Sequence, residues 1–211
     1  MTPYYQDDLV TIWHGDCREW MPEADVIVTD PPWGVSKRPR TYHGMTGPAV
    51  TWDGEFMLPA LPTSAQALCL LPGIANLLRC PDSIGGLTYR WTLSAWVGNG
   101  MTRSPVGYGN WIAALLYAAD GVSIYRQRSD HGKVSISGPR PDHESPKPIE
   151  AMAYFVGMSP PGTILDPYAG SGSTLLAARQ MGRKAIGIEI EERYCEVAAN
   201  RCRQEVLGLA S

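Results

Sequence analysis

The sequence lacks any apolar run approaching the roughly 20 residues that are needed to cross a membrane. Residues 1–8 are polar and acidic, so we expect no signal peptide. The five cysteines are odd in number and include no C-x-x-C pair, which argues against a disulfide framework and against a zinc site. We therefore expect a cytoplasmic protein that associates with no membrane and binds no metal.

A large excess of either charge is absent too. Eighteen Lys and Arg residues face 21 Asp and Glu residues, a net charge of −3. This balance excludes a strongly cationic coat but allows a local basic patch. With 44% hydrophobic and 18% charged residues, the 211-residue chain can bury a core, which excludes a disordered chain or a coiled-coil rod. The length fits one domain, which we place at residues 1–211.

Two blocks of regular pattern flank a less regular middle. In the first block, residues 9–13 and 26–29 are short apolar runs that predict buried strands, and residues 17–24 between them favour a short crossover helix. In the second block, strands alternate with helices: helix 148–158, strand 163–166, helix 173–181, strand 184–189 and helix 191–206. This alternation predicts a βαβ unit, and hence an open, mostly parallel α/β sheet with helices on both faces.

The middle of the chain, residues 34–144, gives weaker signals. Strands are favoured at 68–71 and 87–97, a helix at 111–119 and a strand at 121–125. Residues 39–52 and 126–146 are expected to be loops because they are polar or rich in Pro and Gly.

A glycine-bearing turn follows the strand at 163–166 and opens the next helix. Glycine here lets a ligand approach the backbone closely, and free N–H groups at a helix start favour an anion. Glu189 ends the following strand, 23 residues after Asp166, a spacing that suits an acidic residue bonded to a ribose diol. The turn is neither a G-x-G-x-x-G fingerprint nor a P-loop. It indicates an adenosine-containing cofactor other than NAD, with a plain strand-to-helix turn as the alternative.

The strand at 26–29 ends in Asp30-Pro31-Pro32-Trp33. Two prolines hold the backbone extended and remove two N–H donors, so a carboxylate, carbonyl oxygens and an aromatic ring remain. Such an acceptor-rich pocket suits a planar group with an NH2, because the oxygens accept both hydrogens while the ring stacks. A proline-rich turn with a capping aspartate and a core tryptophan is the alternative.

Together the two motifs resemble the amino-methyltransferases, which use S-adenosylmethionine (SAM) to methylate N6 of adenine or N4 of cytosine in DNA. The family's catalytic motif is Asp/Asn/Ser-Pro-Pro-aromatic, and its cofactor motif resembles Asp-Pro-Phe-x-Gly-Ser-Gly-Thr. Residues 143–148 (HESPKP) are similar to the family's His-Pro-Thr-x-Lys-Pro, with Ser145-Pro146-Lys147 in place of Thr-x-Lys, and Ser173 replaces the Thr of the cofactor motif. The catalytic motif comes first, as in the permuted beta subgroup. The resemblance therefore implies a circularly permuted, Rossmann-like sheet in which the strand before Asp16 lies beside the strand ending at Glu189.

The resemblance also implies roles for individual residues. The catalytic pocket is expected to consist of Asp30, Pro31, Pro32 and Trp33. SAM is expected to contact Asp16, Lys147, Asp166, Tyr168, Ala169, Gly170, Ser171, Gly172 and Glu189. Asp16 is the candidate partner of the cofactor's adenine amino group, and a turn aspartate that bonds its own backbone is the alternative.

Double-stranded DNA is the expected partner, in which the target base must be flipped out and stacked on Trp33. Loops at 34–60 and 126–146 are expected to contact the nucleic acid through Lys37, Arg38, Arg40, Arg126 and Arg128, with ordinary solvated loops as the alternative. By resemblance, Asp at position 30 favours N6 of adenine in a site-specific, restriction-modification enzyme. N4 of cytosine, an RNA or protein amide, and a catalytically silent nucleic-acid-binding module stay open, as does the oligomeric state, a homodimer included.

Overall fold

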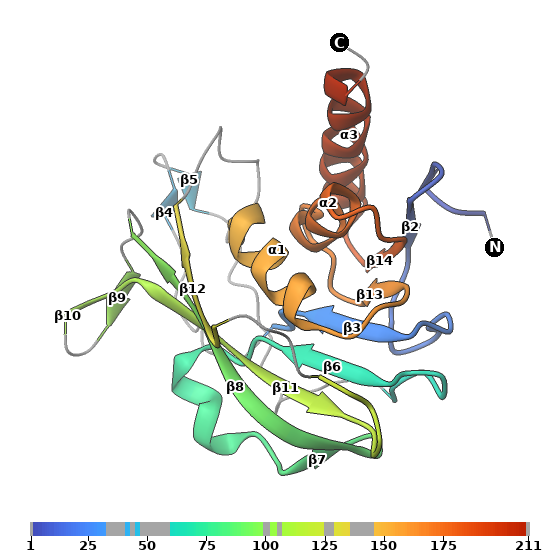
Figure 1. The fold of residues 1–211 in the computed structure, drawn as a ribbon. Helices are drawn as coiled ribbons and strands as arrows, with labels where there is room; N and C mark the ends of the chain where they lie inside the picture. The colour runs from blue at the N-terminus through green and yellow to red at the C-terminus, as the bar shows by residue number, and fades with distance from the viewer. Residues whose placement is uncertain are drawn as a thin grey trace.

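The structure is a computed structural model (Figure 1). It describes residues 2–32, 41–42, 45–46, 60–98, 102–104, 107–124, 129–135 and 146–209. Its centre is a mixed sheet of ten strands in the order β1-β2-β14-β13-β3-β6-β11-β8-β12, with β7 paired to β8. Among the described residues, no helix combines the length and the apolar character that a bilayer span requires.

Five neighbouring strands are parallel and form the half of the sheet that matters for function. They are β2 (Val10–His14), β14 (Ala185–Glu189), β13 (Ile164–Asp166), β3 (Val26–Thr29) and β6 (Ala67–Leu70). All residues of β3 and β6 are buried, which fits strands covered on both faces. The strand β2, near the N-terminus, pairs with β14, near the C-terminus, as the motif order leads us to expect.

The rest of the sheet is largely antiparallel. The strand β11 (Trp111–Ala118) runs antiparallel to both β6 and β8 (Leu87–Val97). Shorter strands complete the edges, namely β1 (Tyr5–Gln6), β7 (Ser83–Ile84) and β12 (His131–Val134). Two separate two-stranded pairs are β4 (Thr41–Tyr42) with β5 (Met45–Thr46), and β9 (Thr102–Ser104) with β10 (Gly107–Gly109).

All three described α-helices pack on one face of the sheet (Figure 1). They are α1 (Ile149–Met158), α2 (Ser173–Gln180) and α3 (Glu192–Leu209). The core on the opposite face contains no α-helix among the described residues; the 3-10 helix η1 (Ile74–Arg79) and loop residues such as Cys17 and Leu61 cover it. The expectation of helices on both faces is therefore wrong for the described part of the chain.

The short connection between β2 and β3 explains part of this difference. Eleven residues, 15–25, join these strands, and two other strands lie between them. The connection must cross roughly 14 Å of sheet, three strand spacings, and also return to the start of a parallel strand. A helix rises only about 1.5 Å per residue, so these residues have to run extended. The predicted crossover helix at 17–24 is accordingly wrong, and turns occupy residues 17–19.

Four predictions for the middle of the chain are also wrong. Residues 111–118 form the strand β11 instead of a helix, because a continuous apolar run whose residues 113–118 are all buried has no alternation to reveal a strand. No strand forms at 121–124. Both predicted loops contain strands: β4 and β5 pair within residues 39–52, and β12, within residues 126–146, adds to the edge of the sheet beside β8.

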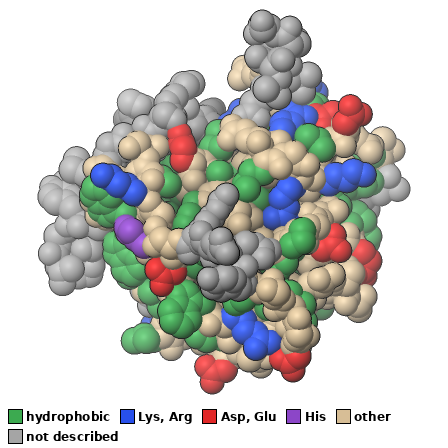
Figure 2. Space-filling model, viewed as in Figure 1, with side chains coloured by type: hydrophobic (Ala, Val, Ile, Leu, Met, Phe, Trp, Pro, Cys, Tyr) green, Lys and Arg blue, Asp and Glu red, His purple; other side chains and the backbone are tan. Residues whose placement is uncertain are grey.

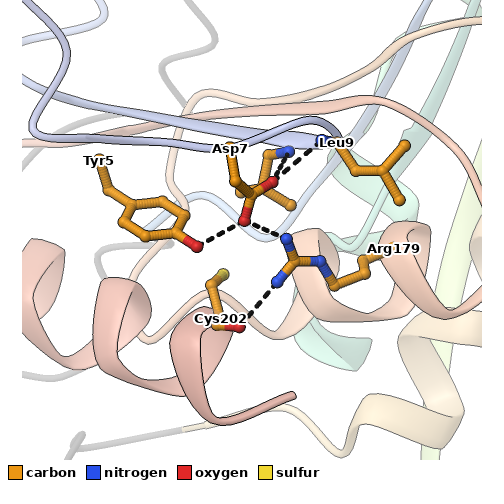
Figure 3. Close-up of polar contacts among 6 residues, drawn as sticks. Tyr5, Asp7, Leu9, Arg179 and Cys202 are labelled. Carbon is orange, nitrogen blue, oxygen red and sulfur yellow. Dashed lines mark hydrogen bonds and ion pairs between the residues drawn. The ribbon is translucent and has the colours of Figure 1, made fainter. Parts of the chain in front are cut away.

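An ion pair between the buried Arg179 and the partly buried Asp7 ties the N-terminal segment to the C-terminal helices (Figure 3). Arg179, on α2, donates to the carboxylate of Asp7 and, through Nη1, to the carbonyl of Cys202 on α3 at 2.7 Å. Asp7 Oδ1 also accepts the N–H groups of Leu9 and Val10. Burial raises the pKa of Asp7, but these hydrogen bonds and one from Tyr5 outweigh it and lower the pKa. The network joins the two ends of the chain where β2 meets β14.

Candidate active site

The carboxyl ends of the parallel strands carry acidic residues from four neighbouring strands. Asp16 follows β2, Glu189 ends β14, Asp166 ends β13 and Asp30 follows β3. These strands are consecutive in the sheet, so the four carboxyl groups lie along one edge. This edge is where open α/β sheets bind their ligands. All four acidic site residues that the sequence indicates are thus brought to the same edge.

Asp166 links the two motifs. Its Oδ1 accepts hydrogen bonds from Thr29 Oγ1, at 2.8 Å, and from the N–H of Tyr168, at 3.1 Å, while Oδ2 accepts from Thr174 Oγ1 at 2.5 Å. Thr29 is the last residue of β3, so the bond fastens the segment before Asp30 to the glycine turn. Asp166 is 3% exposed, and burial raises its pKa to about 6 despite these bonds.

The glycine turn needs glycine at position 172 for two reasons. Gly172 has a φ of 79°, the left-handed region, and a Cβ there would lie 2.9 Å from Cβ of Ala198 on α3. Arg201 of α3 donates to the carbonyl of Ser171 at 2.5 Å and to its hydroxyl at 3.2 Å. Helix α3 therefore supports the turn from behind and fixes the start of α2. In the sequence Arg201 gives no signal of this role, because it comes 30 residues later.

Glu189 completes the turn from the neighbouring strand. Its Oε2 accepts the N–H of Gly170 at 2.9 Å, and Oε1 accepts the N–H of Glu191 at 2.8 Å. Burial raises the pKa of this carboxyl group, and the two backbone hydrogen bonds oppose the shift. Each carboxylate oxygen has a second lone-pair site, so capacity remains for the hydroxyl groups of a ribose. The remaining acceptor sites of Glu189 therefore fit a ribose.

Ile190, directly after Glu189, was missed by sequence reasoning. Its side chain is 47% exposed although it is a large apolar residue at the edge of the site. Its carbonyl lies 3.1 Å from Nε2 of His14, at the end of β2. An exposed apolar side chain beside Glu189 offers a wall for a planar adenine ring. The sequence signal was only that Ile190 interrupts an otherwise acidic stretch.

Asp16 forms a local turn in which its side chain bonds the nearby backbone, which was the alternative expectation for this residue. Its Oδ1 accepts the N–H of Arg18 at 2.9 Å, and both oxygens accept hydrogen bonds from the Arg18 guanidinium. The Arg18 side chain is the main cause of the lowered pKa of Asp16. The assignment of Asp16 to the cofactor's adenine stays a prediction.

Asp30 forms an ion pair with Lys147. The Lys147 ammonium donates to Oδ2 of Asp30 across 117 positions of sequence, and both side chains are partly buried. Pro31 is buried and Pro32 exposed. The structure thus places Lys147, which the resemblance assigns to the cofactor, against the proposed catalytic carboxylate.

The residues expected to stack on the base and to contact DNA lie outside the described residues. They are Trp33, Lys37, Arg38, Arg40, Arg126 and Arg128, and the same holds for most of the two loops 34–60 and 126–146. Over the described part of the face shown in Figure 2, basic and acidic side chains are interspersed. The DNA contacts therefore stay predictions.

Comparisons with known proteins identify the family of the chain. A family model described as DNA methylase, of the N6/N4 type, matches residues 88–200, more than half of the chain. The putative methylase YubD of Escherichia coli (strain K12) is 27% identical over an alignment of 213 positions, gaps included, which covers 89% of this chain and 87% of that protein. The Type II methyltransferase M.ScaI of Streptomyces caespitosus is 50% identical over 48 residues, only 23% of this chain and 16% of that protein.

Solved structures show the same fold at low sequence identity. The M1.HpyAVI–SAM complex is similar with a TM-score of 0.65 and 21% identity, covering 92% of this chain and 100% of that one. The cytosine-N4-specific PvuII DNA methyltransferase is similar with a TM-score of 0.63 and 17% identity, covering 93% of this chain and 87% of that one. The chain therefore belongs to the N6/N4 DNA methylase family, the SAM-dependent DNA amino-methyltransferases.

Proposed function

We propose that the chain transfers a methyl group from SAM to the exocyclic amine of a flipped base in double-stranded DNA, with N6 of adenine as the favoured target. One observation carries the proposal. The ends of β3 and β13 lie side by side and are joined by the 2.8 Å hydrogen bond from Thr29 to Asp166. The acceptor-rich segment Asp30-Pro31-Pro32 therefore adjoins the glycine turn, as a reaction between a base amine and an adenosine cofactor requires.

The chain's own groups prepare the amine. An exocyclic amine is a weak nucleophile because its lone pair is delocalised into the ring. The Asp30 carboxylate and a nearby carbonyl would accept the two N–H hydrogens, which favours a pyramidal nitrogen with an available lone pair. Holding the amine in line supplies much of the remaining rate enhancement. The amine gains the methyl group and gives up one proton, which we expect solvent to accept.

The cofactor site that we propose consists of the turn from Asp166 to Gly172, together with Glu189 and Asp16. When bound, SAM supplies an electrophilic methyl group on its sulfonium. The backbone N–H groups at the start of α2 and the remaining acceptor capacity of Glu189 would hold it. The parallel pairing of β2 with β14 supports a circularly permuted motif order, in which Asp16 comes to the same edge although it lies near the other end of the chain.

The choice between adenine and cytosine rests on position 30. Asp in place of Ser favours N6 of adenine by resemblance, while the chain is similar to proteins that include a cytosine-N4-specific enzyme. Restriction-modification enzymes such as the Type II methyltransferase M.ScaI are among its relatives. We propose that the residues 34–60 and 126–146 contact the DNA and choose the sequence.

The decisive experiment is to express the chain in a host without DNA methyltransferases and to sequence the methylated bases of its genome. N6-methyladenine at a fixed sequence motif supports the proposal. N4-methylcytosine instead would refute adenine as the target and identify the cytosine amine as the substrate. The purified protein is then incubated with labelled SAM and duplex DNA, RNA or protein. Label that appears only in RNA or protein, or in none of the three, refutes the proposed substrate.

A further inference from the structure

The ion pair between Lys147 and Asp30 lies in the proposed site. The family resemblance assigns Lys147 to SAM and Asp30 to catalysis, but it gives the contact between them no role. The Lys147 ammonium donates to Oδ2 of Asp30. Among the described residues, Lys147 Nζ donates one hydrogen bond, and its acceptor is Oδ2 of Asp30. Oδ1 of Asp30 accepts no hydrogen bond from the described residues. One oxygen of the carboxylate is thus held and the other is left available.

The backbone on both sides of the ion pair is stiff. Asp30 precedes Pro31 and Pro32, and Lys147 lies between Pro146 and Pro148. Proline fixes its own φ and restricts the residue before it to extended conformations. Both members of the pair therefore precede a proline, and neither can shift its backbone freely. The pair is a contact between two rigid segments, unlike one between two mobile surface side chains.

Helix stability does not explain a lysine at this position. Lys147 lies directly before the N-cap of α1, Pro148, where the positive end of the helix dipole disfavours a cation. A negative partner offsets this disadvantage, and Asp30 supplies it from another strand. Asp30 is also close enough to Asp166 to contribute to the raised pKa of that buried carboxyl group, although burial is the main cause. The ion pair with Lys147 therefore offsets the negative charge of one of these two neighbouring acidic groups.

We propose that Lys147 is a positioning residue that holds Oδ2 of Asp30, so that Oδ1 is left to accept a hydrogen from the target amine. This inference rests on the proposed function, in which Asp30 contacts that amine. A carboxylate offers about four lone-pair sites, so it can accept from the ammonium and the amine together. A carboxylate that rotated freely would lose the alignment on which the amine depends. Lys147 then acts through Asp30 and contributes little to the affinity for SAM.

The test compares five variants in methyl transfer from labelled SAM to genomic DNA of a methyltransferase-free host. They are Lys147→Met, Lys147→Arg, Asp30→Asn, the double variant Asp30→Asn/Lys147→Met, and the control Lys184→Met. Lys184 is an exposed lysine before the amino end of β14, at the edge opposite to Glu189. The assay measures kcat at saturating DNA and SAM, KM for DNA, and Kd for SAM by calorimetry.

We expect Lys147→Met to lower kcat by roughly 10- to 100-fold, the effect of a misplaced reacting group, with the Kd for SAM unchanged. Lys147→Arg keeps a cationic donor and should recover most of the rate, and Lys184→Met should match the wild type. Asn in the first position also occurs in the family's catalytic motif, so Asp30→Asn should keep a measurable rate. In that background Lys147→Met should have a much smaller effect, because the neutral amide oxygen of Asn is a weaker acceptor for the ammonium than a carboxylate.

Three results would overturn the inference while leaving the proposed function intact. The first is a weaker affinity for SAM in Lys147→Met. The second is a loss of kcat on Lys147→Met that is equal in the wild-type and Asp30→Asn backgrounds. The third is a kcat of Lys147→Met that equals or exceeds that of the wild type. An equal loss in both backgrounds would point to a general structural role. If the wild-type chain itself transfers no label to DNA, the proposed function fails, and the inference fails with it.

Discussion

The buried carboxyl group of Asp166 makes stability depend on pH in a way that one substitution should remove. Burial raises its pKa from 3.8 to about 6. Below the ordinary value, the group is protonated in both folded and unfolded states. As the pH rises through the range from about 4 to 6, the unfolded chain ionises first and is stabilised by water, so folding stability is lost. At about 1.36 kcal/mol per pKa unit, the loss is about 3 kcal/mol by neutral pH.

Asp166→Asn keeps the shape and removes the titration. The amide oxygen can accept from Thr29 and from the N–H of Tyr168, and the amide nitrogen can donate to the Thr174 hydroxyl, which then accepts instead of donating. No polar atom need be left without a partner. We therefore expect the variant to gain stability relative to the wild type as the pH rises, by up to about 3 kcal/mol between pH 4 and pH 7.

Urea denaturation of both proteins at a series of pH values measures this difference. Asp8→Asn, which removes an exposed carboxyl group, serves as the control. The test rests on how the difference in unfolding free energy between Asp166→Asn and the wild type varies with pH. Any effect of the amide on packing is the same at every pH and does not alter this variation. A difference that is constant between pH 4 and pH 7, or that moves in favour of the wild type, would refute the reasoning.

Three further predictions concern the proposed site and the Asp7–Arg179 ion pair that joins the two ends of the chain. Asp30→Ala should lower methyl transfer by about 10²- to 10³-fold, the usual effect of removing an electrostatic partner of the reacting group. Calorimetry should show SAM binding intact, and a lost affinity would mean that Asp30 belongs to the cofactor site. Glu189→Ala should weaken the Kd for SAM by roughly 10- to 100-fold, as expected for lost hydrogen bonds to a charged group, and an unchanged Kd would remove Glu189 from the site. Asp7→Ala should cost about 3–5 kcal/mol, because it leaves the buried Arg179 guanidinium without its carboxylate. Denaturation of the Asp7→Ala/Arg179→Met double variant should recover much of this loss, and additive losses would argue against the pair. Because its pKa is lowered, the stability that Asp7 contributes should be lost as the pH falls below its ordinary value.

Local pattern was enough for the elements that carry the motifs. Residues 26–29 and 163–166 read as buried strands and residues 173–181 as a helix, and the structure has β3, β13 and α2 there. The reason is that short β-branched runs and a glycine-started helix are set by neighbours in sequence. The same local logic failed at β11, where burial on both faces removes the alternation that distinguishes a strand.

The amino-acid sequence by itself determined which chemical groups are available: an acceptor-rich proline segment, a glycine turn and an acid at the end of the next strand. Only the tertiary structure decided that these groups share one edge, because the order of strands in a sheet depends on pairings between distant segments, as for β2 with β14. It also decided that Lys147 faces Asp30, that Arg201 supports the glycine turn and that Arg179 holds Asp7. Each contact joins residues at least 30 positions apart, and no periodicity in a sequence encodes where such side chains meet.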